Sequence, residues 1–345
     1  MKIAINGFGR MGRCIARIIL QRQKEGENIE LVGINDIANA ENLAYLFGRD
    51  SIHRAPDFCA SLEKTQNPKN TPNYLIITQE GIQKKIPLFG YQNPNELDFG
   101  TLGAEVVVES SGIFLTTEQV SHHLQKGVKK VIISAPAKDE TKTFVLGVNH
   151  TQYKGESIIS NASCTTNCLA PIAMILEREF GIERASLSTI HSYTNDQQLL
   201  DVPHRNDKRR SRAAGLNIIP TTTGAAKALY KVLPSLKDKI HGHSLRVPVP
   251  DVSMVDLNAY LAKSVSAQTI NELFEAESRG ALKGILGVDK DFGVSSDFLG
   301  DSRSSIVAQD LTFTLGKMAK IMSWYDNEWG YSTRIIDMAK FILER

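Results

Sequence analysis

Hydrophobic and polar positions follow two alternating patterns along the first third of the chain. Short, almost wholly apolar runs occur at residues 2–5 and 29–34, and again at 104–110 and 128–134. Between the first two runs, apolar positions from Arg10 to Gln23 recur at helical spacing. Apolar strands that alternate with helices are typical of a parallel sheet covered on both faces. The pattern predicts a doubly wound α/β domain over residues 1–163.

The pattern changes after residue 163. Segments 185–194, 244–250 and 252–263 are longer and alternate more regularly, as expected for a mixed, largely antiparallel sheet. They predict an α+β domain over residues 164–328. An amphipathic pattern predicts a last helix at about 329–345, which we expect to pack back onto the first domain. The long polar stretch 194–217 is a candidate binding loop, because irregular segments of this length are usually functional.

Composition limits the possible partners. A chain of 345 residues is long enough for two cores, and its net charge of +2 provides no excess of charge to attract nucleic acid or anionic lipid. We therefore expect no specific nucleic-acid partner. The N-terminus lacks the apolar run of a signal peptide, and no segment reaches bilayer length, so we expect a cytoplasmic protein without membrane association. We expect the four cysteines to be thiols there.

A glycine motif at the N-terminus indicates a dinucleotide site. Gly7, Gly9 and Gly12 follow a predicted strand and open a predicted helix, in the order G-x-G-x-x-G. The glycines allow a tight turn, close approach of a pyrophosphate and close packing of helix on strand. Asp36 ends the second strand, where its carboxylate can accept hydrogen bonds from an adenosine ribose and repel a 2′-phosphate. The motif predicts NAD rather than NADP. The alternative is that the glycines only shape a turn and Asp36 only caps a helix.

Cys164 is the candidate nucleophile. It precedes a helical pattern, and a helix N-terminus lowers the pKa of a thiol. His191 ends the next predicted strand, so a short return path can bring it beside Cys164, where an imidazolium would stabilise a thiolate further. Cys168, one helical turn deeper, is assigned no chemistry. Zinc held by these two cysteines and His191 is disfavoured, because a second pair of ligands at zinc-site spacing is missing. We assign no metal site.

Six motifs together resemble the phosphorylating glyceraldehyde-3-phosphate dehydrogenase family. They are INGFGRMGR, SNASCTTNCLAP, HSYTNDQ, RRSRAAGLNIIPTTTGAAKA, RVPVPDVSMVDL and SWYDNEWGYS, in the family's order. The resemblance implies a Rossmann domain, a catalytic α+β domain and a homotetramer. It also implies NAD-dependent oxidation of glyceraldehyde 3-phosphate, through a thiohemiacetal and a thioester on Cys164, to 1,3-bisphosphoglycerate. His191 would serve as general acid and base.

The resemblance also assigns binding residues. Two anion sites, for the triose phosphate substrate and for inorganic phosphate, would use hydroxyl, backbone N–H and arginine donors: Ser163, Thr165, Thr194, Arg210, Thr223, Gly224 and Arg246. The cofactor would be bound by the glycine motif, the second strand and later residues: Gly7, Phe8, Gly9, Arg10, Met11, Gly12, Asn35, Asp36, Ser134, Asn327 and Tyr331.

Two alternative functions and two departures from the family's usual sequence remain. Erythrose-4-phosphate dehydrogenase shares the thiol, the histidine and the cofactor, although TTTGAAKA argues against it. An NAD-binding protein with an RNA- or protein-binding role is the remote alternative. Val202 stands where NAD-specific relatives usually carry leucine. Residues 65–73, rich in Asn, Pro and Thr, are expected to form a surface-loop insertion.

Overall fold

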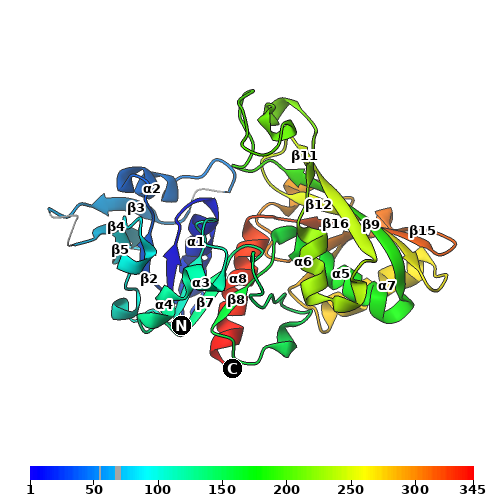
Figure 1. The fold of residues 1–345 in the computed structure, drawn as a ribbon, viewed down its shortest axis with the longest axis horizontal. Coiled ribbons are helices and arrows are strands. Elements are labelled where there is room, and N and C mark those ends of the chain that lie inside the picture. Colours follow the sequence, from blue (N-terminus) through cyan, green and yellow to red (C-terminus); the bar gives the residue numbers. More distant parts are fainter. Residues whose placement is uncertain (54–55, 67–70) are drawn as a thin grey trace. The chain divides into compact units, whose positions relative to one another are not determined.

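A computed structural model describes residues 1–53, 56–66 and 71–345. Of the predicted surface-loop insertion, residues 67–70 lie outside the described residues. The chain divides into two compact units, each of which contains an eight-stranded mixed sheet with helices packed against it (Figure 1). The first unit consists of residues Met1–Thr143, Tyr153–Asn161 and Ser332–Arg345, and the second of Phe144–Gln152 and Ala162–Tyr331. Among the described residues, no helix has the length and apolar character needed to cross a membrane.

The first unit is a doubly wound α/β domain. Its sheet has the order β3-β4-β5-β2-β1-β6-β7-β8. The strands β5, β2, β1, β6, β7 and β8 are parallel to one another, and β3 and β4 add antiparallel strands at one edge. The chain leaves β1 toward β2 and returns on its other side at β6, so the order reverses at β1. Ligands of such sheets bind at the carboxyl ends of the strands at this reversal. The strands are β1 (Lys2–Asn6), β2 (Glu30–Asn35), β3 (Cys59–Glu63), β4 (Asn73–Gln79), β5 (Ile82–Phe89), β6 (Val106–Glu109), β7 (Lys130–Ile133) and β8 (Ile158–Ser160).

Helices complete the first unit. The last helix contributes residues from Ser332 onward, held by an ion pair of 2.7 Å between Arg22 and Asp337 and by edge-on contact of Phe341 with Tyr153. Apolar β1 and β6 residues are fully buried, as the unbroken apolar runs require. The helices are α1 (Arg10–Lys24), α2 (Ala40–Phe47), α3 (Thr117–Val120), α4 (His122–Gln125) and α8 (Trp329–Leu343), which begins in the second unit.

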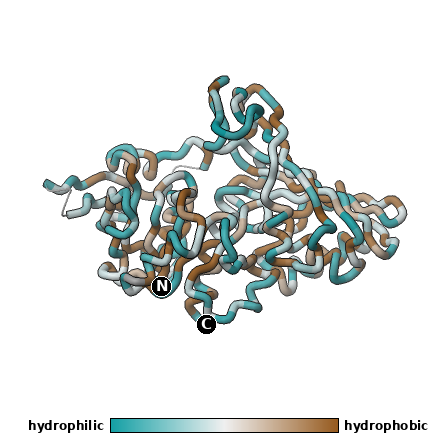
Figure 2. Tube along the Cα trace, viewed as in Figure 1, coloured by the Kyte–Doolittle hydropathy of each residue, from teal (hydrophilic) through white to brown (hydrophobic). Residues whose placement is uncertain are grey.

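The second unit is a mixed, largely antiparallel sheet packed against helices. Its order is β10-β11-β9-β12-β16-β14-β13, with β15 paired to β16. Its core includes Val145, which explains why residues Phe144–Gln152 belong to this unit. Figure 2 shows hydrophobic stretches running through each unit and hydrophilic turns at its margins. The elements are α5 (Cys164–Phe180), β9 (Ile182–Ser192), β10 (Ile219–Thr222), α6 (Ala225–Val232), β11 (Ile240–Val247), β12 (Ser253–Leu261), α7 (Ala267–Arg279), β13 (Leu286–Asp289), β14 (Ser305–Ala308), β15 (Phe313–Leu315) and β16 (Met318–Tyr325).

Candidate active site and dinucleotide site

A thiol and an imidazole meet at the start of α5. Ser163 caps this helix, because its Oγ accepts a hydrogen bond of 3.1 Å from the backbone N–H of Thr166. Cys164 is therefore the first helical residue. His191 lies near the end of β9, and its Nε2 is 3.7 Å from the Cys164 Sγ. A local helix start and the strand after the helix bring together two residues that are far apart in sequence.

Arg246 is the third member of this cluster. Strand β11 runs parallel to β9, with Arg246 paired opposite His191. The Arg246 Nη1 lies 2.8 Å from His191 Nδ1 and donates a hydrogen bond of 3.0 Å to the Ser192 carbonyl. The same carbonyl is 2.7 Å from His191 Nδ1. One imidazole tautomer donates from Nδ1 to Ser192 and leaves Nε2 as an acceptor toward sulfur, whereas the other accepts from Arg246 and presents Nε2–H to sulfur.

The charge state of the pair differs from the predicted thiolate and imidazolium. Burial, together with the positive charge of Arg246, lowers the pKa of His191 to about 3. Burial raises the pKa of the Cys164 thiol, and the charge of Arg246 and hydrogen bonds from Thr165 oppose that rise. In this geometry His191 is neutral at physiological pH because a buried imidazolium beside a guanidinium is disfavoured. The cation that favours the thiolate is Arg246.

Buried hydroxyls surround the cluster. The fully buried Tyr325 hydroxyl lies 2.9 Å from the Oγ1 of Thr165 and 2.9 Å from that of Thr189. The ring of Tyr325 meets that of His191 edge-on. Sequence reasoning missed Tyr325, although it occupies an inward position in the alternating pattern of β16. Thr165 and Tyr325 thereby fix the first turn of α5 to the end of β16.

The expected anion ligands lie in several places. Thr194 begins the loop after β9, where its carbonyl accepts from Gln197 N–H. The Arg210 side chain forms ion pairs with Asp196 and Asp207 in this structure, so its guanidinium already has carboxylate partners. Thr223 and Gly224 precede α6 and follow β10, at the opposite end from Ile219, which pairs with Arg246. The strand register therefore separates Thr223 from Arg246 along the sheet.

Two serines orient the Asn327 side chain. Its Oδ1 accepts hydrogen bonds from Ser253 Oγ at 2.6 Å and Ser192 Oγ at 2.8 Å. With its carbonyl oxygen so engaged, the amide N–H₂ is the group that Asn327 can offer to a ligand. The Tyr331 hydroxyl donates to the Ala162 carbonyl at 2.8 Å. Ser192 and Ser253 were not predicted from the sequence.

The glycine motif of the first unit has the geometry of a dinucleotide loop. Gly7 has a φ of +93° and follows β1. A Cβ at Gly12 would lie 2.2 Å from the Gly7 carbonyl oxygen, so only glycine lets α1 approach the loop this closely. Helix α1 begins after Gly9 without a side-chain cap, which leaves backbone N–H groups of its first turn, from Arg10 and Met11 onward, as anion donors.

Carboxyl ends of the neighbouring strands supply the polar groups. The Asp36 Oδ2 accepts from the Phe8 N–H at 2.6 Å and its Oδ1 from the Ala38 N–H at 2.8 Å. These contacts aim the carboxylate at the loop and leave lone pairs for further donors. Ser134 follows β7, where its N–H donates to the Glu109 carbonyl.

Comparisons with known proteins decide the family. Residues 163–327 match the model of the glyceraldehyde 3-phosphate dehydrogenase C-terminal domain, and residues 1–117 match that of the glyceraldehyde 3-phosphate dehydrogenase NAD binding domain. The chain is 50% identical to glyceraldehyde-3-phosphate dehydrogenase of Helicobacter pylori, over 99% of each chain. The chain belongs to the glyceraldehyde-3-phosphate dehydrogenase family. The resemblance drawn from the motifs is confirmed.

Other relatives in the family span nearly the whole chain as well. The cytosolic enzyme of Pinus sylvestris is 48% identical, over 98% of this chain and 96% of its own. That of Geobacillus stearothermophilus is 47% identical, over 100% and 99%. The family's NAD-binding domain and its C-terminal domain confirm the predicted fold class and cofactor. The glycine loop also has the close packing of strand, turn and helix that the motif requires, since a Cβ at either Gly7 or Gly12 would meet backbone atoms at less than 3.0 Å.

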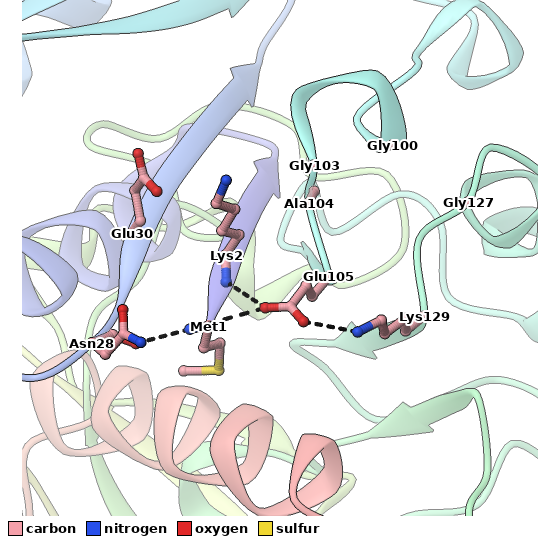
Figure 3. Close-up of a pocket in the computed structure, with 10 residues that line it drawn as sticks. All are labelled: Met1, Lys2, Asn28, Glu30, Gly100, Gly103, Ala104, Glu105, Gly127 and Lys129. Carbon is pink, nitrogen blue, oxygen red and sulfur yellow. Dashed lines mark hydrogen bonds and ion pairs between the residues drawn. The ribbon is translucent and has the colours of Figure 1, made fainter.

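A cavity of about 500 Å³ lies at the amino ends of the parallel strands of the first sheet. It is lined by the starts of β1 and β2 and by the segments before β6 and β7 (Figure 3). There the Glu105 carboxylate accepts from Lys2 N–H at 3.1 Å and pairs with Lys129 at 2.9 Å. Because dinucleotides bind at the carboxyl ends of parallel strands, this cavity is not the cofactor site.

Proposed function

We propose that this chain catalyses the NAD-dependent oxidative phosphorylation of glyceraldehyde 3-phosphate to 1,3-bisphosphoglycerate. The observation that carries the proposal is the Cys164–His191–Arg246 cluster at the start of α5, in a chain whose family is established. Bound NAD supplies the acceptor for the hydride. The chain's own residues supply the nucleophile, the proton transfers and the binding of anions.

Cys164 forms the covalent intermediates. Its sulfur bonds to the aldehyde carbon while the thiol proton passes to His191 Nε2 and then to the new alkoxide, giving a thiohemiacetal. When that carbon is oxidised, Nε2 takes the hydroxyl proton, and a thioester remains on sulfur. Inorganic phosphate then attacks the thioester carbon, the C–S bond breaks, and the acyl phosphate leaves. A neutral imidazole suits the first step, because it can accept the thiol proton.

Arg246 and the first-turn groups of α5 bind the anions in this proposal. The guanidinium offers a planar set of donors to phosphate oxygens, and Ser163, Thr165, Thr223 and Gly224 add hydroxyl and backbone donors. Thr194 and Arg210 assist, and Arg210 must then exchange its carboxylate partners for phosphate. The buried amide of Asn327 and the ring of Tyr331 would position the nicotinamide.

We further propose a cytoplasmic homotetramer. Large apolar side chains of the loop after β9 are exposed, with Leu199 85%, Leu200 68% and Leu216 83% accessible. Exposed apolar side chains grouped in this way are typical of an interaction surface. Sedimentation velocity measures the assembly directly, and a monomer at micromolar concentration would contradict it.

A steady-state assay with and without inorganic phosphate tests the reaction. We expect NADH formation from glyceraldehyde 3-phosphate to require phosphate. We expect Cys164→Ser to abolish oxidation and to leave NAD binding, measured by calorimetry, unchanged. Phosphate-independent turnover, with erythrose 4-phosphate as the better substrate, would contradict the proposal and favour the related dehydrogenase. Retained oxidation by Cys164→Ser would refute the role of the thiol.

A further inference from the structure

Glu109 is a buried carboxyl group at the point where the strand order of the first sheet reverses. It is the last residue of β6 and is only 2% exposed. It pairs with Asn6, the last residue of β1, directly before Gly7. Among the described residues, no lysine or arginine forms an ion pair with it. No predicted catalytic or cofactor role uses this carboxyl. Its partners are donors from Asn6 and Ser111.

A directional chain of hydrogen bonds ends at Glu109. The Tyr91 backbone N–H donates to Asn35 Oδ1 at 2.8 Å, and the Asn35 Nδ2 donates to Asn6 Oδ1 at 2.9 Å. The Asn6 Nδ2 then donates to Glu109 Oε2 at 2.6 Å. Because a backbone N–H can only donate, it fixes the orientation of both amides. The chain must therefore end on an acceptor, and a carboxylate accepts without donating.

The second carboxylate oxygen holds the turn that supports the glycine loop. Glu109 Oε1 accepts from the Ser111 N–H at 2.8 Å and from the Ser111 hydroxyl. A Cβ at Gly7 would lie 2.4 Å from the Ser111 nitrogen, so the loop rests directly on this turn. The Ser110 hydroxyl donates to the Gly7 carbonyl at 2.7 Å. Any shift of the turn must displace Gly7.

We propose that Glu109 is a positioning residue that holds the dinucleotide loop in its NAD-binding conformation through Ser111 and Asn6. This inference rests on the proposed function, because it assumes that the loop binds NAD. Burial raises the pKa of Glu109 to about 7, and the bonds from Ser111 and Asn6 oppose that rise. The ionised group satisfies every donor that faces it, whereas a neutral amide in its place has one acceptor oxygen and must set its N–H₂ against either the Asn6 N–H₂ or the Ser111 N–H.

The test moves the carboxylate from position 109 to position 6 of this series of hydrogen bonds. Glu109→Gln places two donors face to face, and Asn6→Asp places two acceptors face to face. The double variant Asn6→Asp/Glu109→Gln keeps one carboxylate, one amide and the net charge, and restores a donor for every acceptor. We expect each single variant to raise the Kd for NAD about 10-fold, and the double variant to return it to within about 3-fold of wild type. Titration calorimetry with NAD on the full chain provides these values.

Three outcomes decide the inference. We expect kcat at saturating NAD to change less than about 2-fold in Glu109→Gln, because Cys164 and His191 are untouched. Unchanged NAD affinity in Glu109→Gln with a lowered melting temperature would show a merely structural role and overturn the inference. A double variant no better than the worse single variant would overturn it too. Wild type that fails to bind NAD would instead refute the proposed function.

A milder variant covers the case in which Glu109→Gln does not fold. Ser111→Ala removes one hydroxyl donor and leaves the carboxylate and the backbone bond in place. We expect the Kd for NAD to rise about 3-fold, with no change in kcat at saturating NAD. A Kd equal to that of wild type would count against the positioning role.

Discussion

Replacing Arg246 by methionine removes the cation that faces His191 and keeps most of the aliphatic length. In the structure the guanidinium contacts His191 Nδ1 at 2.8 Å and the Ser192 carbonyl at 3.0 Å. Its charge lowers the pKa of the imidazole and opposes the rise that burial causes in the pKa of the Cys164 thiol. We therefore expect the thiol pKa to rise further in Arg246→Met. The imidazole pKa is expected to rise as well, because a repelling charge has gone.

The size of the thiol shift follows from two contacts. The sulfur is 3.7 Å from His191 Nε2, and Arg246 Nη1 is 2.8 Å from Nδ1 on the same ring. The guanidinium therefore lies at most about 9 Å from the sulfur, and at an effective dielectric constant of about 20 this separation corresponds to about 2 kcal/mol. That energy corresponds to roughly a 20-fold change in the equilibrium between thiol and thiolate. A shorter separation makes the shift larger.

Alkylation by iodoacetamide as a function of pH measures the thiolate fraction of Cys164. Cys59 is exposed, whereas Cys14 and Cys168 are buried, so a Cys59→Ser background isolates the signal. We expect the midpoint of alkylation to move up by at least one pH unit in Arg246→Met. The matched control is Arg210→Gln, which removes a cation already paired with Asp196 and Asp207.

An unchanged midpoint in Arg246→Met would refute the reasoning that Arg246 favours the thiolate. A downward shift would show that His191 becomes protonated once Arg246 is gone and forms the ion pair itself. An equal upward shift in Arg210→Gln would show that the effect comes from the general field of the loop rather than from the contact at His191.

Two further predictions concern the first unit. The Asp36 carboxylate accepts from the Phe8 N–H, and Asp36→Asn keeps the size of this side chain but removes its charge. We therefore expect the preference for NAD over NADP, measured as the ratio of kcat/KM values, to fall at least about 10-fold. An unchanged ratio would contradict a role of Asp36 in cofactor discrimination. Burial beside His122 lowers the pKa of His123 to about 3, so the unfolded chain binds a proton below pH 6.5 that the folded chain does not. The free energy of unfolding therefore decreases as pH falls from 6.5 toward 3, and His123 alone accounts for a decrease of about 2 kcal/mol at pH 5. We expect His123→Leu to reduce the loss of melting temperature between pH 7 and pH 5, and an equal loss in both proteins would argue against this group.

Local elements of the site could be predicted because short-range interactions specify them. The strand, glycine turn and helix of residues 2–24 follow from apolar runs and from the freedom of glycine at positive φ. The start of α5 follows from Ser163, whose hydroxyl caps the helix and places Cys164 in its first turn. Such features depend on residues within one helical turn, so the sequence contains the necessary information.

Long-range contacts decided the remainder. The pairing of Arg246 with His191 depends on the parallel register of β11 and β9, and the neutral state of His191 depends on burial that only the folded sheet creates. The partners of Arg210 and the chain from Asn35 through Asn6 to Glu109 likewise join residues distant in sequence. The sequence alone determined the family and the two folds and predicted Cys164 as the nucleophile, because motifs and periodicity are local. Tertiary structure alone decided charge states and hydrogen-bond partners, because both depend on the removal of water from groups that meet only after folding.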